Sequence, residues 1–400
     1  MHKAVSVSRD TWWVGVNDRE TDLFESLWAL PRGVSYNAYV IAGERTAAID
    51  TVKGPWLDEY EHKLAEALGG RDLDYLVVNH MEPDHAGLIS CLRRRWPNLK
   101  LVGNARTLPL IRGYHGIDTN ILEVKEGEDL DLGGHVLQFF MLPMGHWPES
   151  MATFDASTGT LFSNDAFGGF GAHEGGLFDD QRTREPWEDE MLRYYAAIVA
   201  RCSTGVQNAL KKLGGLSIKN IFPSHGTLFR GDPARALELY NRWSRQETDP
   251  GAAVVYGSMY GNTRRMAEAV CEGLVEGGVK DVRLMDASRT ETSFLLRDIW
   301  RARGLALLSC TYNTLLFPPM EALCSKLLNR CLKGRVLGLA GSYSWSRGAL
   351  SALQSFAEKV NLERAEPDVE VCTAPTAEDL AACEALGRDM SAKITAHVGE

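Results

Sequence analysis

Apolar and polar residues alternate along the first part of the chain with the period of β-strands. Residues 35–42 and 46–50 form two such stretches around a turn at 43–45, and this arrangement predicts a β-hairpin. Residues 56–68 carry apolar side chains at helical spacing and end at two glycines, which predicts a helix. The apolar stretch at 74–78 predicts a buried strand. Strands and helices mixed in this way indicate an α/β layer domain.

The strand at 74–78 leads directly into four side chains that can bind metals. They are His80, Glu82, Asp84 and His85. If the chain stays extended, His80 and Glu82 point to the same side, because side chains alternate along a strand. Pro83 bends the chain, so Asp84 and His85 can turn toward a second centre at the start of a helix expected over about 85–96. A helix cap explains Asp84 alone. The four residues together predict half of a metal site.

Three further candidate ligands also follow strands. His146 comes after a strand expected at 136–142, Asp165 lies in the segment 160–168, and His225 lies in the segment 221–226. Any one of these residues alone would more often have a structural role. All seven candidates share one position, the loop at the end of a strand, where α/β folds usually assemble their sites. We therefore expect them to form one centre.

Length, charge and cysteine spacing narrow the class of protein. A chain of 400 residues is too long for one hydrophobic core, so we expect at least two domains. The net charge of -10, without a Lys/Arg-rich block, argues against nucleic acid as a partner. No signal peptide is visible, and no apolar run approaches the roughly 18 residues that span a bilayer. The 8 cysteines include no C-x-x-C pair, which excludes rubredoxin-like and zinc-ribbon sites. We expect a soluble, cytoplasmic protein with no membrane partner.

The pattern changes after a segment of turn composition at 247–251. A buried strand at 252–256 is followed by a loop of small and hydroxyl residues at 257–263, and then by a helix. Backbone N–H groups at the helix start, with the hydroxyls of Ser258 and Thr263, make a phosphate site. The lysine of a nucleotide-hydrolysing P-loop is missing. A flavin phosphate has no leaving group to activate and needs no such lysine.

Two more loops, after strands at 306–310 and 336–340, complete a likeness to flavodoxin. All three loops resemble those of flavodoxins, which implies a doubly wound parallel sheet of order 2-1-3-4-5 with FMN at the switch point. Tyr312, Tyr343 and Trp345 suit contact with a flat isoalloxazine ring. Arg347 either places a cation near that ring or lies in solvent. The expected FMN-binding residues are Ser258, Met259, Tyr260, Gly261, Asn262, Thr263, Thr311, Tyr312, Asn313, Ser342, Tyr343, Ser344, Trp345, Ser346, Arg347 and Gly348.

The candidate ligands stand in motifs that resemble a known family. The chain carries His-x-Glu-x-Asp-His at 80–85, Gly-His-Trp-Pro at 145–148, Asn-Asp-Ala-Phe-Gly at 164–168 and Ser-His-Gly at 224–226. This order resembles the metallo-β-lactamase fold, and within it the flavodiiron proteins. Most hydrolases of the fold have a histidine where this chain has Glu82. The carboxylate makes the site harder and more anionic, which suits an iron pair that cycles between ferrous and ferric.

The resemblance implies an arrangement of domains and ligands. Residues 1–249 would form a metallo-β-lactamase-like αββα sandwich with the di-iron centre, and residues 250–400 a flavodoxin-like domain with one FMN. Trp147 and Tyr195 would line the substrate pocket, and Trp28 lies in a region where some relatives have a pocket histidine. In the implied ligand set, one iron is bound by His80, Glu82 and His146, the other by Asp84, His85 and His225, and Asp165 bridges them.

The resemblance also implies a function. A two-electron flavin and a two-electron iron pair hold four electrons, which matches reduction of dioxygen to two waters; coupling two nitric oxide molecules to nitrous oxide is the alternative. Electrons would come from an external donor such as rubredoxin or a reduced soluble coenzyme, and the chain would form a head-to-tail homodimer or a dimer of dimers. Two other classes of protein stay open. One is a zinc hydrolase with an appended flavodoxin module, and Glu82 argues against it. The other is a pure electron carrier, and the seven candidate metal ligands argue against it.

Overall fold

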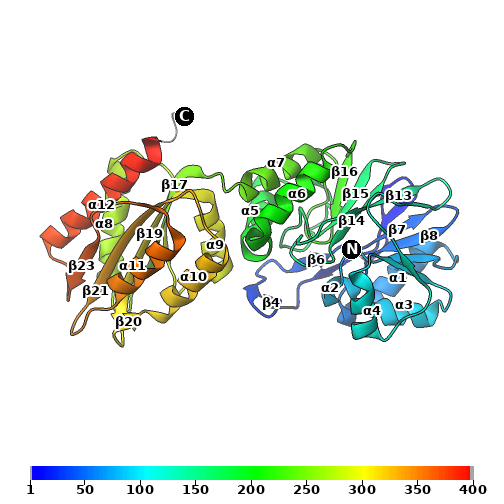
Figure 1. Cartoon of the computed structure of the whole chain (residues 1–400), viewed down its shortest axis with the longest axis horizontal. Helices are drawn as coiled ribbons and strands as arrows, with labels where there is room; N and C mark the ends of the chain where they lie inside the picture. The colour runs from blue at the N-terminus through cyan, green and yellow to red at the C-terminus, as the bar shows by residue number, and fades with distance from the viewer. Residues whose placement is uncertain (1, 397–400) are drawn as a thin grey trace. The chain divides into compact units, whose positions relative to one another are not determined.

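The computed structural model describes residues 2–396, and the chain divides into two compact units between Ser244 and Arg245 (Figure 1). Each unit has a hydrophobic core of its own, so each is described separately. None of the helices within residues 2–396 has both the length and the apolar character needed to cross a bilayer.

The N-terminal unit is built on two sheets. The first has the order β1-β2-β7-β8-β9-β10-β11 and the second the order β12-β13-β14-β15-β16. The strands of the first sheet are β1 (Val5–Ser8), β2 (Thr11–Trp13), β7 (Tyr39–Ala42), β8 (Thr46–Ile49), β9 (Tyr75–Val77), β10 (Lys100–Gly103) and β11 (Ile121–Glu123). The strands of the second are β12 (Asp129–Asp131), β13 (Val136–Met141), β14 (Met151–Asp155), β15 (Thr160–Asn164) and β16 (Asn220–Pro223). Two small hairpins pair β3 (Val16–Asp18) with β6 (Val34–Tyr36) and β4 (Leu23–Phe24) with β5 (Trp28–Ala29).

The two sheets bury their apolar faces against each other. Tyr39 and Val77 of the first sheet lie in one buried cluster with Phe139, Phe162 and Phe222 of the second. Figure 1 shows α1, α3 and α4 gathered on one side of this unit and α5, α6 and α7 on the other. The expected αββα sandwich is therefore confirmed. The helices are α1 (Leu57–Leu68), α2 (Pro83–Ala86), α3 (Ile89–Arg95), α4 (Thr107–His115), α5 (Arg184–Tyr194), α6 (Ser203–Leu213) and α7 (Pro233–Ser244), with short turns η1 (Gly54–Trp56), η2 (Asp179–Gln181), η3 (Tyr195–Val199) and η4 (Ala200–Cys202).

The hairpin expected from the alternation at 35–50 is present, but its first strand is shorter. β7 and β8 pair antiparallel, with Ala42 opposite Thr46. Residues 34–36 form β6 instead, and the chain leaves the sheet at Asn37, whose side-chain amide donates to the carbonyl oxygens of Pro223 and Gly226. These long-range hydrogen bonds divide the expected strand in two.

The single helix expected over 85–96 is also interrupted. α2 ends at Ala86 and α3 begins at Ile89. The carbonyl oxygen of His85 accepts hydrogen bonds from the backbone N–H and the hydroxyl of Thr51, at 2.7 Å each, and is thereby taken out of the helical pattern. A Cβ on Gly87 would lie 2.6 Å from the carbonyl oxygen of Pro83 and 2.9 Å from the backbone nitrogen of Gly54. The break therefore comes from close packing against residues 51–54.

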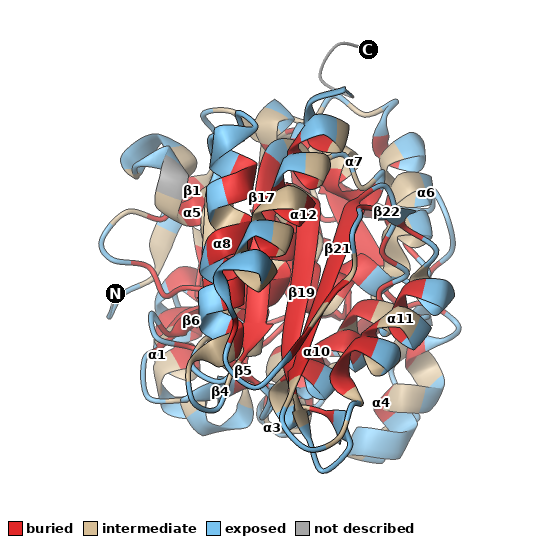
Figure 2. Cartoon of the chain, turned by 90° about the vertical axis from the view of Figure 1, so that its left-hand side faces the viewer, coloured by how far each residue is buried: buried red, intermediate tan, exposed pale blue. Residues whose placement is uncertain are grey.

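The C-terminal unit has the expected doubly wound sheet. Its strand order is β18-β17-β19-β21-β22, which is the predicted order 2-1-3-4-5, and the pairings of this path are parallel. Figure 2 shows the buried strands β17, β19 and β21 of this sheet behind helices with exposed outer faces. The strands are β17 (Asp249–Gly257), β18 (Val282–Asp286), β19 (Ala302–Tyr312), β20 (Leu315–Leu316), β21 (Val336–Tyr343), β22 (Glu363–Arg364) and β23 (Val369–Cys372); the helices are α8 (Asn262–Glu276), α9 (Thr292–Arg301), α10 (Pro318–Asn329), α11 (Ala349–Val360) and α12 (Ala377–Ala396).

One local prediction at the junction of the two units is wrong. The turn expected at 247–251 extends too far, because Asp249 already pairs with Ala302 and begins β17. The pairing is irregular between Asp249 and Ala252, and the strand can therefore include Pro250 and Gly251, two residue types that are common in turns.

Candidate metal centre and cofactor loops

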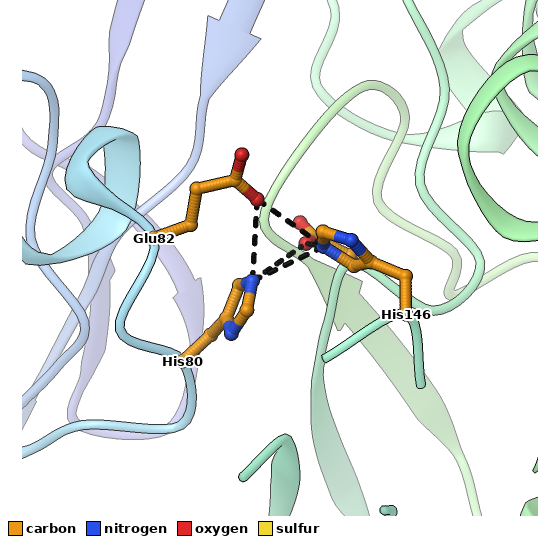
Figure 3. A group of neighbouring side chains, drawn as sticks. His80, Glu82 and His146 are labelled. Carbon is orange, nitrogen blue, oxygen red and sulfur yellow. Dashed lines mark hydrogen bonds and ion pairs between the residues drawn. The ribbon is translucent and has the colours of Figure 1, made fainter. Parts of the chain in front are cut away.

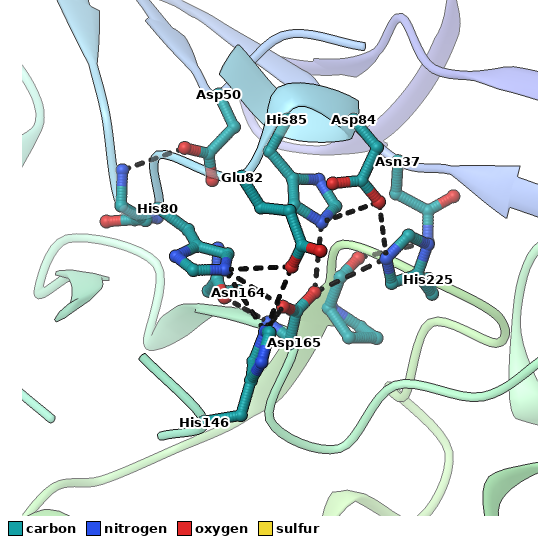
Figure 4. A network of polar contacts seen from close by, with 12 residues as sticks. Asn37, Asp50, His80, Glu82, Asp84, His85, His146, Asn164, Asp165 and His225 are labelled. Carbon is teal, nitrogen blue, oxygen red and sulfur yellow. Dashed lines mark hydrogen bonds and ion pairs between the residues drawn. The ribbon is translucent and has the colours of Figure 1, made fainter. Parts of the chain in front are cut away.

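The structure brings all seven candidate ligands to one place, at the ends of strands from both sheets of the N-terminal unit (Figure 4). They form two groups, and within each group the potential ligand atoms all lie within 4.8 Å of one another. The first group is His80, Glu82, His146 and Asp165, and the second is Asp84, His85 and His225.

The first group has the spacing of ligands around one ion (Figure 3). Nε2 of His80 lies 3.3 Å from Oε2 of Glu82 and 3.1 Å from Nε2 of His146. Nε2 of His146 lies 3.2 Å from the same Glu82 oxygen and 2.7 Å from Oδ2 of Asp165. Ligands bound at about 2.1 Å to one ion stand roughly 3.0–3.4 Å from each other, so these four atoms suit a shared ion.

Asp165 joins the two groups through its two carboxylate oxygens. Oδ2 faces His146 of the first group, whereas Oδ1 lies 3.0 Å from Nε2 of His85 and 3.3 Å from Nε2 of His225. Asp84 completes the second group, with Oδ2 at 3.4 Å from both of these imidazole nitrogens. A carboxylate with one oxygen toward each of two groups has the geometry of a bridge between two ions.

Several ligand atoms are buried without any hydrogen-bond partner. They are both carboxylate oxygens of Asp84, Oδ1 of Asp165, and Nε2 of His85 and of His225. Leaving a buried polar atom unsatisfied costs about 1–3 kcal/mol, and more for a charged group. Five such atoms in one cluster point to bound cations. Four imidazoles and three carboxylates form a donor set that suits iron.

Two of the histidines are oriented by groups behind them. Nδ1 of His80 donates to Oε1 of Glu149 at 2.7 Å, and this oxygen also accepts from the backbone N–H of Met81. Nδ1 of His225 donates to the carbonyl oxygen of Ser35 at 2.9 Å. These bonds direct Nε2 of each ring toward the cluster, as is usual for metal-binding histidines. Sequence reasoning missed Glu149, whose only signal is an acidic residue two positions before the buried strand β14.

The carboxylates keep protons on these histidines when no metal is bound. Burial lowers the pKa of His80, but its bonds to Glu149 and Glu82 outweigh burial and raise the pKa to about 9. Burial also opposes the charge on His225, and Asp165 and Asp84 raise that pKa to about 10. The pKa of Asp165 is well below its usual value, because the surrounding histidines outweigh the effect of burial. The cluster is therefore a strongly coupled site whose protons an incoming metal replaces.

The predicted pocket aromatics do not share one location. The ring of Trp147 stands edge-on to His80, with centroids 5.1 Å apart. Tyr195 packs against Tyr240 and its hydroxyl lies 2.9 Å from that of Ser203. Its neighbour Tyr194 is the tyrosine beside the cluster, 5.5 Å from the ring of His225. α5 ends at Tyr194 and a π-helical turn begins at the next residue, which directs the two side chains differently.

An acidic side chain that the sequence did not reveal lies near the first group. Glu25 lies in the turn between β4 and β5, and its Oε2 accepts from the indole N–H of Trp28 at 3.2 Å. Partial burial, followed by the charge of Glu82, raises the pKa of Glu25 to about 7. Phe24, in the same hairpin, stands edge-on to His225 at 5.2 Å. Trp28, which lies in the region where some relatives have a pocket histidine, thus donates a hydrogen bond to Glu25.

The three predicted cofactor loops of the C-terminal unit meet around a small cavity of about 150 Å³. Nine of its lining residues were predicted to bind FMN: Ser258, Met259, Tyr260, Asn262, Thr263, Thr311, Ser342, Tyr343 and Ser344. Cys310 and Thr373 complete the lining and were not predicted. The other predicted residues lie outside this lining: Gly261, Tyr312, Asn313, Trp345, Ser346, Arg347 and Gly348.

The first loop has the features of a phosphate site. Gly261 adopts a φ of 95°, which favours glycine, at the N-terminus of the 15-residue helix α8. Ser258 accepts from the Gly261 N–H at 3.0 Å, and the hydroxyls of Thr263 and Ser342 lie 2.9 Å apart. Hydroxyls and backbone N–H groups thus converge where the helix dipole favours an anion, and these residues fit a flavin phosphate.

Two aromatic residues and one cation near the ring position are exposed. Trp345 is 77% and Tyr312 43% exposed, so both have apolar surface available to a ring or a partner. The guanidinium of Arg347 is 72% exposed, pairs with Glu370 at 3.1 Å and donates to the Tyr343 hydroxyl. Of the two alternatives for Arg347, the structure supports a solvent-exposed cation that holds Tyr343.

Comparisons with known proteins agree with both halves of the chain. A family model described as "ODP family beta lactamase" matches residues 34–226, and the flavodoxin model matches residues 254–387. The "Nitric oxide reductase" of Moorella thermoacetica is 35% identical over 400 residues, which covers 98% of this chain and 100% of that protein. The chain belongs to the flavodiiron proteins.

Solved flavodiiron structures agree with this assignment. The rubredoxin oxygen:oxidoreductase of Desulfovibrio gigas superposes with a TM-score of 0.94 at 26% identity and covers 100% of both chains. The flavodiiron protein of Giardia intestinalis superposes with a TM-score of 0.93 at 25% identity, over 99% of this chain and 98% of that one. As a flavodiiron protein, the chain uses FMN in its flavodoxin-like unit and a di-iron centre in its β-lactamase-like unit.

Proposed function

We propose that this flavodiiron protein reduces dioxygen to water at an iron pair, with electrons from an external donor that pass through FMN. The observation that carries the proposal is the position of Asp165, whose two oxygens face two separate groups of ligands. In this assignment His80, Glu82 and His146 bind one iron, Asp84, His85 and His225 bind the other, and Asp165 bridges them.

The protein's own residues shape the reaction around these groups. When bound, FMN supplies electrons and the iron pair supplies a site where a small gas binds and is reduced. Glu82, Asp84 and Asp165 balance the charge of two cations, and Glu149 holds His80 in orientation. The edge-on ring of Trp147 covers one side of His80 and keeps water from it. Burial and the charge of Glu82 raise the pKa of Glu25 to about 7, so this carboxyl can both take up and release a proton near neutral pH.

Nitric oxide is the second candidate substrate, because two of the similar proteins are named for it. The Moorella relative is named a nitric oxide reductase, and the "Anaerobic nitric oxide reductase flavorubredoxin" of Escherichia coli is 30% identical over 97% of this chain and 82% of its own length. Conversion of two nitric oxide molecules to nitrous oxide and water takes two electrons and two protons, and the residues of the same two groups would hold the metals that bind the gas. The Desulfovibrio relative is named for oxygen instead, so the fold accommodates either gas.

We further propose that the chain works as a head-to-tail homodimer, or a dimer of dimers, in the cytoplasm, with rubredoxin or a reduced coenzyme as donor. Exposed apolar side chains lie at both sites: Leu23 and Leu27 on the hairpin beside the metal cluster, and Tyr260, Leu315 and Trp345 near the cofactor loops. Pairing of one protomer's hairpin with its partner's cofactor loops would cover this surface. The 8 free cysteines agree with a reducing compartment.

The experiment that tests the function is gas consumption by the iron-loaded, FMN-bound protein, fed by a non-physiological reductase. Dioxygen and nitric oxide are compared at matched concentrations, and peroxide and nitrous oxide are measured as products. Faster dioxygen turnover without peroxide supports the oxygen reductase. Faster nitric oxide turnover to nitrous oxide supports the second candidate. Absence of turnover with both gases would contradict the proposal. The molar mass of the protein in solution, measured by light scattering, tests the dimer separately.

A further inference from the structure

The N-terminal unit contains a second cavity that holds none of the metal ligands. Its volume is about 360 Å³, and it lies between the segment that follows Asp165, the start of α5 and the strand-like segment after His225. The lining is mixed, with charged, polar and aromatic side chains. The charged residues are Arg32, Arg182, Glu174 and Glu190, and the aromatic residues are Phe167, Phe170, Trp187 and Phe229.

The charges of this wall do not cancel. The carboxylate of Glu190 is already neutralised by Arg193, at 2.8 Å from Nε and 2.7 Å from Nη2. Among the residues that the structure describes, no carboxylate lies within 4.0 Å of the guanidinium of Arg32 or of Arg182. Among the side chains that the structure describes, Glu174 is then the one acidic group of the lining left to oppose two arginines. The wall has an excess of positive charge inside a partly enclosed space.

Arg182 is held in place at the edge of the cavity. Its Nη1 donates to the hydroxyl of Thr227 at 3.0 Å, and the Thr227 side chain is itself buried. Burial lowers the pKa of Arg182, the charge of Glu174 raises it, and the nearby charge of Arg32 lowers it further. The charge of Arg32 thus adds to burial in disfavouring the charge of the half-buried Arg182, and an anion between the two guanidinium groups would relieve this cost.

Further donors lie in the same wall. Thr183 lies directly before the 11-residue helix α5, whose first backbone N–H groups have no helical partner and where the dipole is positive. The indole N–H of Trp187 has no hydrogen-bond partner among the described residues, although its side chain is only 6% exposed. The wall therefore offers hydrogen-bond donors besides the two arginines, which again suits an anion.

The rest of the wall is aromatic. Trp187 and Phe229 are in edge-to-face contact at 5.3 Å, and Phe170 lies beneath the guanidinium of Arg193. Such surfaces contact apolar or flat groups. We propose that this cavity binds a small organic anion, with its carboxylate or phosphate between Arg32 and Arg182 and its apolar part against the aromatic wall.

The cavity is separate from the metal centre, although both use the same two segments. The backbone N–H of Gly169 donates to the carbonyl oxygen of His225 at 3.3 Å, and a Cβ on Gly226 would lie 2.7 Å from the Gly169 carbonyl oxygen. This close backbone contact joins the segment behind Asp165 to the segment behind His225. An anion in the cavity therefore contacts the backs of two ligand segments and not the ligands themselves. The site goes beyond gas reduction and does not depend on it.

The test is calorimetric titration of the full chain, loaded with iron and FMN so that the metal centre and the phosphate loop are both filled. Phenyl phosphate and benzoate are the probes, and inorganic phosphate measures the contribution of charge alone. We expect one phenyl phosphate or benzoate per chain, with inorganic phosphate at least tenfold weaker. Arg182→Gln and Arg32→Gln should each lower the affinity for the organic probes at least tenfold. Glu174→Gln should raise the affinity for the same probes, because this substitution removes the negative charge that opposes an anion.

Arg184→Gln is the matched control. Arg184 is the first residue of α5 and lies two positions after Arg182, but it pairs with Asp232 at 3.1 Å and is absent from the lining. This variant should bind the probes as the wild type does. If Arg182→Gln fails to fold, Arg32→Gln and Glu174→Gln test the same site, because both side chains are exposed. Absence of binding for both organic probes would overturn the proposal. So would binding that neither arginine variant changes, or equal weakening in Arg184→Gln.

Discussion

Nδ1 of His80 lies 2.7 Å from Oε1 of Glu149, a fully buried carboxylate 69 residues further along the chain. This contact fixes the side of the imidazole that faces the metal cluster and increases its basicity. The position of a ligand thus depends on a residue that no ligand motif contains.

Replacement of Glu149 should therefore weaken metal binding without removing a ligand. We expect Glu149→Gln to lower the iron affinity of the His80 group by about 10- to 100-fold. Competition with a chelator, followed by iron analysis per chain, measures the effect. Glu123→Gln is the control, because Glu123 lies on β11 with its side chain exposed. Equal iron affinity in both variants would show that the Glu149 contact has no role in binding.

The bridging position of Asp165 predicts a difference between two ligand variants. Asp165→Ala removes an oxygen from both groups, so we expect loss of both irons after dialysis against a chelator. His225→Ala removes a ligand from the second group only, so the first group should keep its iron. The iron content per folded chain, with circular dichroism as the check of folding, separates these outcomes. Retention of one iron by Asp165→Ala would show that this residue serves only one ion.

The flavin loop predicts an effect restricted to the C-terminal unit. Thr263 is buried at the start of α8 with its hydroxyl beside that of Ser342. Loss of a hydrogen bond to a charged group costs about 1.5–3 kcal/mol, so Thr263→Val should weaken FMN binding by roughly 10- to 150-fold. Fluorescence titration of FMN measures this affinity, with the exposed Ser288→Ala as control. Unchanged FMN affinity, or loss of iron instead, would contradict the role given to Thr263.

A buried histidine outside the cluster predicts how acid destabilises the N-terminal unit. Burial, with the charge of Arg182, lowers the pKa of His173 to about 3. Its Nε2 donates to Oδ1 of Asn37, while Nδ1 has no partner, so a second proton would be buried unsatisfied. The unfolded state takes up that proton near pH 6.5, so the free energy of unfolding should fall by up to about 1.4 kcal/mol per pH unit below that value.

His173→Gln removes this titration while the amide still reaches Asn37. Urea unfolding of the wild type and the variant, in the same metal state at pH 7 and pH 5, measures the difference. The wild type should lose more stability than the variant over this interval. Equal losses in the two proteins would show that His173 does not contribute to the acid sensitivity.

Sequence reasoning was most successful where function depends on local position. Each of the seven candidate ligands lies in a loop after a strand, and the parallel strands of the C-terminal unit coincide with apolar runs. The positions of these strands could therefore be predicted from hydrophobic patterns along the sequence. The order of the C-terminal sheet followed from the resemblance of the three cofactor loops to those of flavodoxins, and the structure confirms that order. These features are specified by segments of ten residues or fewer.

What the sequence could not predict depends on contacts between distant segments. Thr51 takes the carbonyl of His85 out of the helix, and Asn37 leaves its strand to bind the segment around Pro223. The neighbours Tyr194 and Tyr195 cannot be distinguished by spacing, because the π-helical turn between them is set by packing. The roles of Glu149 and Glu25 depend on His80 and Glu82, which come near them only when the chain folds.

The most direct test of the central claim is the effect of Glu82→Ala on two reactions of the same FMN-loaded protein. Glu82 belongs to the metal group of the N-terminal unit, whereas the flavin loops lie in the other unit. We predict that Glu82→Ala loses at least 99% of its consumption of dioxygen and nitric oxide, while its FMN is reduced at the wild-type rate by an artificial reductase. Gas consumption at the wild-type rate in Glu82→Ala would contradict the di-iron assignment.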